Sequence, residues 1–189
     1  MRMNALLLGT AVLGLVATLS SGAHANLITN GGFETGNFSG WTQGGNTGST
    51  GVVTSGFDGY APNGGSYFAA LGPVGSDGTL SQTFHDVAGQ ALSVSFYLAS
   101  DGRTANDFSA SFDGTSLVHL VNAGAQGYTL YSYDVTGTGT DTLQFGFRND
   151  PGYLALDDVA VAPSAVPEPA SLALLGTGLL GLMRRRRGA

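Results

Sequence analysis

The chain has no cysteine and no lysine, and only 11% of its 189 residues are charged. Without thiols the protein forms neither disulfides nor thiolate metal sites, and cysteine catalysis is excluded. Twelve of the thirteen carboxylates lie within residues 26–162, where Arg103 and Arg148 are the only arginines, so the net charge of this region is near −10. A surface this acidic repels nucleic-acid phosphates, and we expect no nucleic-acid partner.

Helical periodicity is also missing from residues 26–162, while glycine is abundant, with 31 residues in the whole chain. Residues 92–98 alternate apolar and polar side chains, which is the pattern of a half-buried strand. Asp113-Gly114 separates two further runs of this kind and predicts a hairpin. Strands are expected over 91–100, 108–112, 117–121, 128–135, 142–147 and 153–161, with weaker signals over 51–54, 67–71 and 79–84. Short strands at regular spacing predict an all-β fold, a single jelly-roll β-sandwich.

The N-terminal segment, residues 1–25, has the three parts of a secretory signal peptide. It begins with a basic residue, Arg2, continues with an apolar stretch over 5–19 and ends on Ala23-His24-Ala25. This pattern predicts export and cleavage after Ala25. A transmembrane helix is the alternative, but the apolar run is short and small polar residues follow it.

The C-terminal tail, residues 163–189, also has three parts. Pro167, Glu168 and Pro169 precede an apolar segment over 170–183, which an arginine cluster over 184–187 follows. As a helix the apolar segment would be ~21 Å long, shorter than the ~30 Å hydrocarbon core of a bilayer. The arginines favour the cytoplasmic side, so the preceding domain is expected outside the inner membrane.

This order of motif, short apolar helix and arginines resembles the PEP-CTERM sorting signal of Gram-negative bacteria. The resemblance implies that an exosortase, an integral-membrane enzyme, recognises the chain and cuts near the Pro-Glu-Pro motif. The helix then anchors the chain in the membrane only before processing. A plain tail anchor is the alternative, although so short a span anchors poorly. The residues expected to carry the signal are Pro167, Glu168, Pro169, Arg184, Arg185, Arg186 and Arg187.

Five segments of the middle region occur in a recognisable order: Asn26–Glu34, Gly40-Trp41, Pro62–Phe68, Leu80–Phe84 and Leu156–Val159. In this order they resemble the galactose-binding-like jelly rolls, the fold of many carbohydrate-binding modules. The resemblance covers nearly all of residues 26–162 and implies the same fold for this domain. It supports fold more than function, because that fold also occurs in adhesins and enzyme accessory domains.

The same resemblance implies a structural Ca²⁺ site where the first and last strands pair. It nominates Glu34 and Asp158 as ligands, with Asp157 as an alternate and a backbone carbonyl near Asn30 as a further donor. Carboxylate and carbonyl oxygens are the ligands that calcium prefers. The alternative is that these carboxylates are solvated or cap turns.

Catalytic constellations are hard to find in residues 26–162. Asp157 and Asp158 are neighbours in an expected strand, so we expect their side chains on opposite faces, where they cannot act as a glycosidase pair. His85 and His119 are expected to be ordinary surface histidines, since neither has a partner pattern for catalysis. The domain is therefore predicted to be non-enzymatic.

A glycan site would need aromatic faces beside polar groups. Tyr131 and Tyr133 share one face of an expected strand, and Tyr97 and Arg103 are further candidates, with Asn106 and Asp107 near them in sequence. Half-buried packing is the alternative for the tyrosines. Trp41, in its Gly-Trp setting, is expected in the core.

Together these features predict a non-catalytic surface or extracellular-matrix protein that binds polysaccharide. Its domains are expected at 1–25, 26–162 and 163–189. The alternatives are a purely structural matrix or biofilm protein without a defined ligand and, third, a glycan-active enzyme. The location expected is outside the inner membrane of a Gram-negative bacterium, first anchored and then at the cell surface or beyond it.

Overall fold

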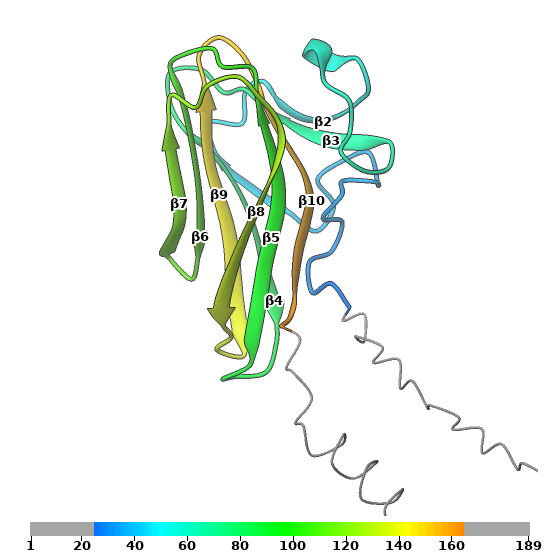
Figure 1. Cartoon of the computed structure of the whole chain (residues 1–189), viewed down its shortest axis with the longest axis vertical. Coiled ribbons are helices and arrows are strands. Elements are labelled where there is room, and N and C mark those ends of the chain that lie inside the picture. Colours follow the sequence, from blue (N-terminus) through cyan, green and yellow to red (C-terminus); the bar gives the residue numbers. More distant parts are fainter. Residues whose placement is uncertain (1–24, 165–189) are drawn as a thin grey trace, which may run out of the picture.

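The computed structural model of the chain describes residues 25–164 (Figure 1), so residues 1–24 of the predicted signal peptide and residues 165–189 of the sorting tail lie outside the described residues. Within this range the chain forms ten strands and one short 3₁₀ helix. The elements are β1 (Thr42–Gly45), β2 (Thr50–Thr54), η1 (Phe57–Gly59), β3 (Tyr67–Leu71), β4 (Gly78–His85), β5 (Ala91–Ser100), β6 (Asn106–Phe112), β7 (Thr115–Val121), β8 (Gln126–Thr136), β9 (Thr140–Asn149) and β10 (Leu154–Pro163).

The strands make two five-stranded sheets that face each other. One has the order β1-β4-β9-β6-β7 and the other β2-β3-β10-β5-β8, and neighbouring strands in both are antiparallel. This is the predicted all-β sandwich, and every strand expected from alternation is present. The hairpin at Asp113-Gly114 is also confirmed, because both residues have the positive φ (47° and 75°) that a tight strand-to-strand turn requires.

Strand β1 was not predicted, because its sequence Thr-Gln-Gly-Gly shows no apolar alternation. It forms by pairing with β4, with Thr42 opposite Ser81 and Gly45 opposite Gly78. A side chain at Gly45 would meet the carbonyl oxygen of Asp77 at 2.5 Å, so glycine permits this close approach. Only the tertiary pairing makes this segment a strand.

The core lies between the two sheets and is rich in phenylalanine. Phe96 of β5 packs against Phe145 of β9 at a ring distance of 5.1 Å and against Phe108 of β6 at 5.7 Å. Trp41 is buried, its ring 6.0 Å from Phe145, so the prediction of a core position for this tryptophan is confirmed. These contacts join both sheets into one core.

The first residues of the described range run beside the last strand. The amide of Leu27 donates to the carbonyl of Val161 at 2.7 Å. The side chain of Asn26 donates to the Val159 carbonyl at 3.0 Å and accepts from the Val161 amide at 3.0 Å. Within residues 25–164, no helix has the length and apolar character to cross a membrane.

Candidate functional site

Three carboxylates gather where residues 30–34, the loop 62–66 and strand β10 meet. Glu34 follows a turn in which Asn30 and Phe33 have positive φ values of 53° and 57°. Asp157 and Asp158 lie in β10. A side chain built on Gly32 would lie 3.5 Å from an oxygen of Asp158, 3.7 Å from the Glu34 side chain and 3.9 Å from an oxygen of Asp157. The missing side chain of Gly32 thus leaves space between all three.

Backbone amides of the loop 62–66 and of neighbouring residues hold these carboxylates in place. Glu34 accepts from the amides of Ser66, at 2.9 Å, and Tyr67, at 3.1 Å. Asp157 accepts from the amide of Asn63 at 2.8 Å and from the amide of Asp158 at 2.8 Å. The side chain of Asn63 donates to Asp158 at 2.8 Å, so one loop contacts all three acids.

The expectation that Asp157 and Asp158 point to opposite faces is wrong. The pairing of β10 with β5 shifts register between Asp157 and Ala160, and Asp158 has a positive φ of 49°. Such a bulge breaks the two-residue alternation of side chains. Both carboxylates therefore lie on the same side, where Asn63 reaches each of them.

Asn30 forms the turn that precedes Glu34. Its side chain donates to the carbonyls of Asn37, at 2.9 Å, and Ser39, at 3.1 Å. Its own carbonyl accepts from the indole of Trp41, at 3.1 Å, and from the Phe33 amide, at 3.2 Å. Since these two bonds occupy both lone pairs of that oxygen, Asn30 supports the turn, and a carbonyl donor for a cation would come from a neighbouring residue.

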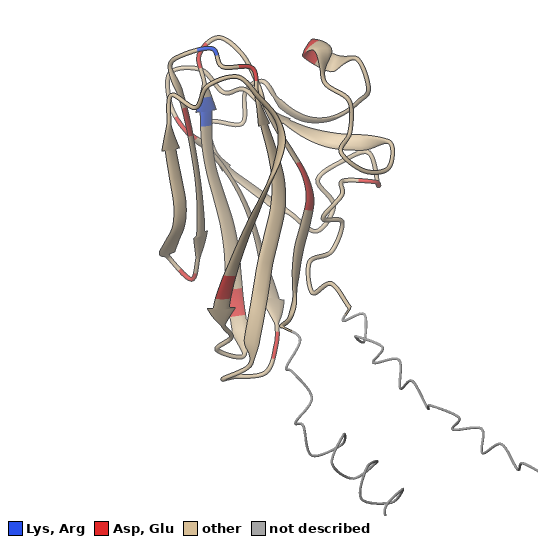
Figure 2. Ribbon diagram, in the orientation of Figure 1, with Lys and Arg blue, Asp and Glu red and all other residues tan. Residues whose placement is uncertain are grey.

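No positive side chain balances the three acids within the described residues. Arg103 pairs with Asp58 and Asp101, and Arg148 pairs with Asp77 and Asp150. Both blue segments in Figure 2 lie near one end of the sandwich, apart from the red segment of β10.

In residues 25–164 no group of three His, Cys, Asp or Glu side chains has the arrangement of a preformed metal centre. Oxygens of Asp157 and Asp158 and the Cγ of Glu34 lie around Gly32. Carboxylates are ligands that calcium prefers, and carbonyls and water would have to supply the rest of its shell.

The pH dependence of stability in EDTA should report on Asp157. Burial raises the pKa of this fully buried carboxyl to about 6, although hydrogen bonds from Gly64 and Asp158 oppose the shift. The folded state therefore holds the proton more tightly than the unfolded state does. The resulting stabilisation is complete below the ordinary pKa of about 4 and is lost as pH rises through 6, a difference of about 2–3 kcal/mol.

Thermal melts of the chain in EDTA between pH 4 and 8 measure this effect. The melting temperature should fall as pH rises from 5 to 7, and Asp157→Asn should flatten that fall. Asp134→Asn, which removes an exposed aspartate on β8, is the matched control and should keep it. An equally steep fall in Asp157→Asn would contradict the assignment to Asp157.

A second candidate site is the outer face of the sheet β1-β4-β9-β6-β7, which we call the open face. No described element packs on it (Figure 1). Two cross-strand hydrogen bonds lie on it: the hydroxyls of Thr83 and Thr142 bond each other at 2.8 Å, and the imidazole of His85 bonds the Thr140 hydroxyl at 3.0 Å. The outward positions of its three central strands are mostly small and polar: Thr79, Ser81, Thr83, Gln144, Gly146, Ser109 and Ser111.

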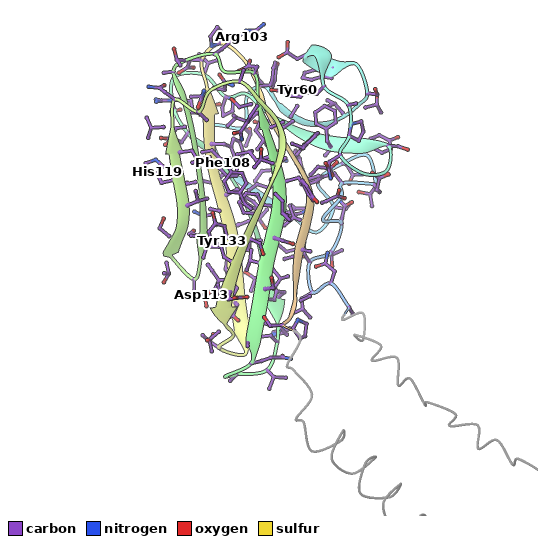
Figure 3. All side chains as sticks on the ribbon, in the orientation of Figure 1. Tyr60, Arg103, Phe108, Asp113, His119 and Tyr133 are labelled. Carbon is purple, nitrogen blue, oxygen red and sulfur yellow. The ribbon has the colours of Figure 1, made fainter. Side chains whose placement is uncertain are left out.

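The predicted aromatic candidates are not brought together. Tyr131 stacks on Phe96 at a ring distance of 5.3 Å, and Tyr133 lies 6.4 Å from the same ring, so both tyrosines face the core from the edge strand β8. Tyr97 follows Phe96 on β5 and points to the opposite face of the sheet. Figure 3 places Tyr133 well away from Arg103, at the end of the sandwich. A glycan contact by any of these residues stays a prediction.

The two histidines of the domain lie on the open face. The imidazole of His119 bonds the carboxylate of Asp107 at 2.8 Å, and its side chain is 57% exposed. Ser109 lies opposite His119 in the strand register, but its hydroxyl donates to the Gly146 carbonyl at 3.5 Å instead of to the imidazole. The pair thus forms a polar edge to the open face.

Comparisons with known proteins separate the tail from the domain. Residues 165–187 match the PEP-CTERM protein-sorting motif. No curated protein matches the chain. Among solved structures, the chain is similar to the module TmCBM61 in complex with beta-1,4-galactotriose, with 21% identity, a TM-score of 0.60, and coverage of 74% of this chain and 99% of that one.

Two further structures are similar in the same region. The CBM22-1 xylan-binding domain of Xyn10C from Paenibacillus barcinonensis has 17% identity and a TM-score of 0.51, over 77% of this chain and 98% of that one. The enzymatically active domain of tailspike protein 4 from bacteriophage CBA120 has 20% identity and a TM-score of 0.54, over 73% of this chain and 21% of that one. At these identities the likeness concerns the fold.

The sorting motif indicates an exported chain that is anchored in a membrane transiently and processed by an exosortase. The described domain has the jelly-roll architecture found in carbohydrate-binding modules. This chain therefore carries a PEP-CTERM sorting motif after a β-sandwich whose fold is similar to that of carbohydrate-binding modules.

Proposed function

We propose that the chain is a non-catalytic surface or matrix protein of a Gram-negative bacterium, whose sandwich binds extracellular polysaccharide through the open face. The observation that carries the proposal is an uncovered sheet whose central outward positions are mostly neutral hydroxyl and amide side chains, on a domain similar to carbohydrate-binding modules. These groups both donate and accept hydrogen bonds, as sugar hydroxyls do. A long polymer can therefore contact several strands at once.

The shape of the open face suits an extended chain. Gly146 lies at its centre, between Thr79 of β4 and Ser109 of β6. A side chain at this position would come within 2.7 Å of the Ser109 hydroxyl. Because residue 146 is glycine, no side chain protrudes from the middle of the face. The face carries no aromatic platform among its central outward positions, so binding rests on hydrogen bonds, and we expect modest affinity per sugar.

We also propose that calcium binds Glu34 and Asp158 as a structural ion, with Asp157 beside it. The support is that three acids lie near Gly32 and that the ion pairs of both arginines of the domain are to other carboxylates. A bound cation would offset the repulsion between them and join residues 30–34, the loop 62–66 and β10. The ion lies away from the open face and would stabilise the fold instead of contacting glycan.

Replacing Gln144 should weaken polysaccharide binding. Its exposed amide lies on β9, the middle strand of the open face, and Gln144→Ala removes a donor and an acceptor there. Loss of one such bond corresponds to roughly a three- to tenfold weaker affinity. Affinity electrophoresis through gels that contain β-galactan, xylan or exopolysaccharide from the source bacterium measures it, using the full chain in a detergent without a sugar head group.

Gln90→Ala is the matched control, since Gln90 lies in the turn before β5 and should leave binding unchanged. Wild-type retention by none of the polysaccharides would contradict the proposed function and favour a structural matrix role. If Gln144→Ala is retained as strongly as the wild type, the binding site is not on the open face.

A further inference from the structure

A pocket lies on the outer side of the other sheet, at its β2 edge. Its volume is about 280 Å³, and no charged side chain lines it. Its floor includes Gly51 and Ala70, which are paired across β2 and β3. Its residues are Ser49, Thr50, Gly51, Val53, Phe57, Ala70 and Tyr153. The pocket is separate from the open face and from the three acids around Gly32.

Small residues at the floor create the pocket, and aromatic rings form its walls. A side chain built on Gly51 would have no heavy atom within 4 Å, so the space above this glycine is empty. Phe57 and Tyr153 meet edge to face at a ring distance of 4.8 Å. Gly72 makes room for the ring of Tyr153, since a side chain at Gly72 would come within 2.6 Å of it.

A network of polar contacts holds both aromatic walls. The hydroxyl of Tyr60 donates to the carbonyl of Tyr153 at 3.1 Å. Arg103 lies 3.6 Å from Asp58, the residue after Phe57, and 3.4 Å from Asp101. Asp101 in turn accepts from the amide of Tyr153 at 3.1 Å.

Figure 3 shows Arg103 and Tyr60 near the same end of the molecule. Arg103 is thus a positioning residue that joins the two walls through Asp58 and Asp101. The sequence suggests Arg103 as a candidate ligand contact, whereas in the structure its ion pairs are with these two carboxylates. The walls are set before any ligand arrives, which reduces the ordering cost of binding.

We propose that this pocket binds one neutral sugar ring, at a chain end or a branch of the polysaccharide. Its volume equals that of about nine water molecules in the liquid, which suits a single ring rather than an oligosaccharide. Phe57 and Tyr153 offer faces for the apolar side of the ring, and Ser49 and Thr50 offer hydroxyls. The uncharged lining favours a neutral sugar over a uronic acid, because none of the lining side chains is positive and Arg103 is paired with Asp58 and Asp101.

The position of the pocket fits this role in an anchored chain. Tyr153 precedes β10, whose other end at Pro163 leads to the sorting motif. Ten residues of strand span ~33 Å. The pocket therefore lies near the end of the sandwich opposite Pro163. This inference rests on the proposed function, because it adds a single-sugar subsite to a polysaccharide-binding domain.

The test is a titration of the ¹⁵N-labelled full chain, in a detergent without a sugar head group, with the neutral methyl glycosides of galactose, glucose, mannose and rhamnose. At least one should shift the amide signals of Gly51 and Thr50, with an affinity on the order of millimolar, since one ring offers few contacts. Gly51→Val fills the pocket and should weaken that binding at least about tenfold. Valine suits an edge strand, so the fold should survive.

Gly127→Val is the matched control, because Gly127 also lies on an edge strand with open space beside it. It should leave the titration unchanged. The inference is overturned if no methyl glycoside shifts these amides, or if Gly51→Val binds as the wild type does. Polysaccharide retention, which depends on Gln144, is scored separately, so failure of the pocket and failure of the proposed function are distinguishable.

Discussion

Removal of calcium should lower the melting temperature of the exported chain by about 10 °C at pH 7. Glu34, Asp157 and Asp158 lie near one another without a positive side chain, at the place where the first described segment meets the last strand. An ion present at roughly 100 times its dissociation constant stabilises the folded state by about 3 kcal/mol. In a domain of this size each kcal/mol corresponds to about 4 °C.

Calorimetric melts in 1 mM calcium and in EDTA measure the difference. Glu34→Gln should abolish most of it, because the variant keeps the side-chain shape and loses a charged ligand. Asp77→Asn is the control, since Asp77 is 61% exposed and pairs with Arg148 far from the three acids. Equal melting temperatures with and without EDTA would refute the calcium proposal, and so would a full calcium response in Glu34→Gln.

Gly31→Ala should destabilise the domain by about 3 kcal/mol or more. A side chain at Gly31 would overlap the carbonyl oxygen of Val159, whose own amide donates to the Gly31 carbonyl at 3.0 Å. The obstacle is backbone in the last strand, so it cannot rotate away. The substitution therefore separates residues 30–34 from β10, and it also displaces the bond from Asn26 to Val159.

Urea unfolding in saturating calcium and in EDTA measures this loss. Gly127→Ala is the matched control, because a side chain there meets nothing within 4 Å. The loss in Gly31→Ala should be larger in calcium, since the same separation moves Glu34 away from Asp158. If Gly31→Ala changes the free energy of unfolding by less than about 0.5 kcal/mol, as ordinary surface substitutions do, residues 30–34 do not pack against β10 as described.

Local pattern was enough for most of the strands. The alternation in residues 92–98 predicts both the extent of β5 and the side of it that is buried, because a strand exposes its faces with a period of two. The turn at Asp113-Gly114 was readable because few residue pairs tolerate two positive φ values. Strand β1 was not readable, since its two glycines matter only for their contact with β4.

The sites were less predictable than the strands. Glu34, Asp157 and Asp158 were nominated from a family resemblance, and the structure brings them near one another. The bulge that turns both aspartates to one side has no local signal, because it arises from the pairing of β10 with β5. For Tyr131 and Tyr133 the strand pattern predicted that they share one face. It did not predict that this face packs on Phe96 in the core.

The sequence by itself determined the all-β class, most strand positions, the acidic charge and the sorting motif, since each depends on residues close together in the chain. The tertiary structure alone decided which sheet face stays open, where Arg103 is held and how Gly51 and Ala70 form the floor of a pocket. Those features depend on pairings between distant strands, and a two-residue period cannot say which strands become neighbours.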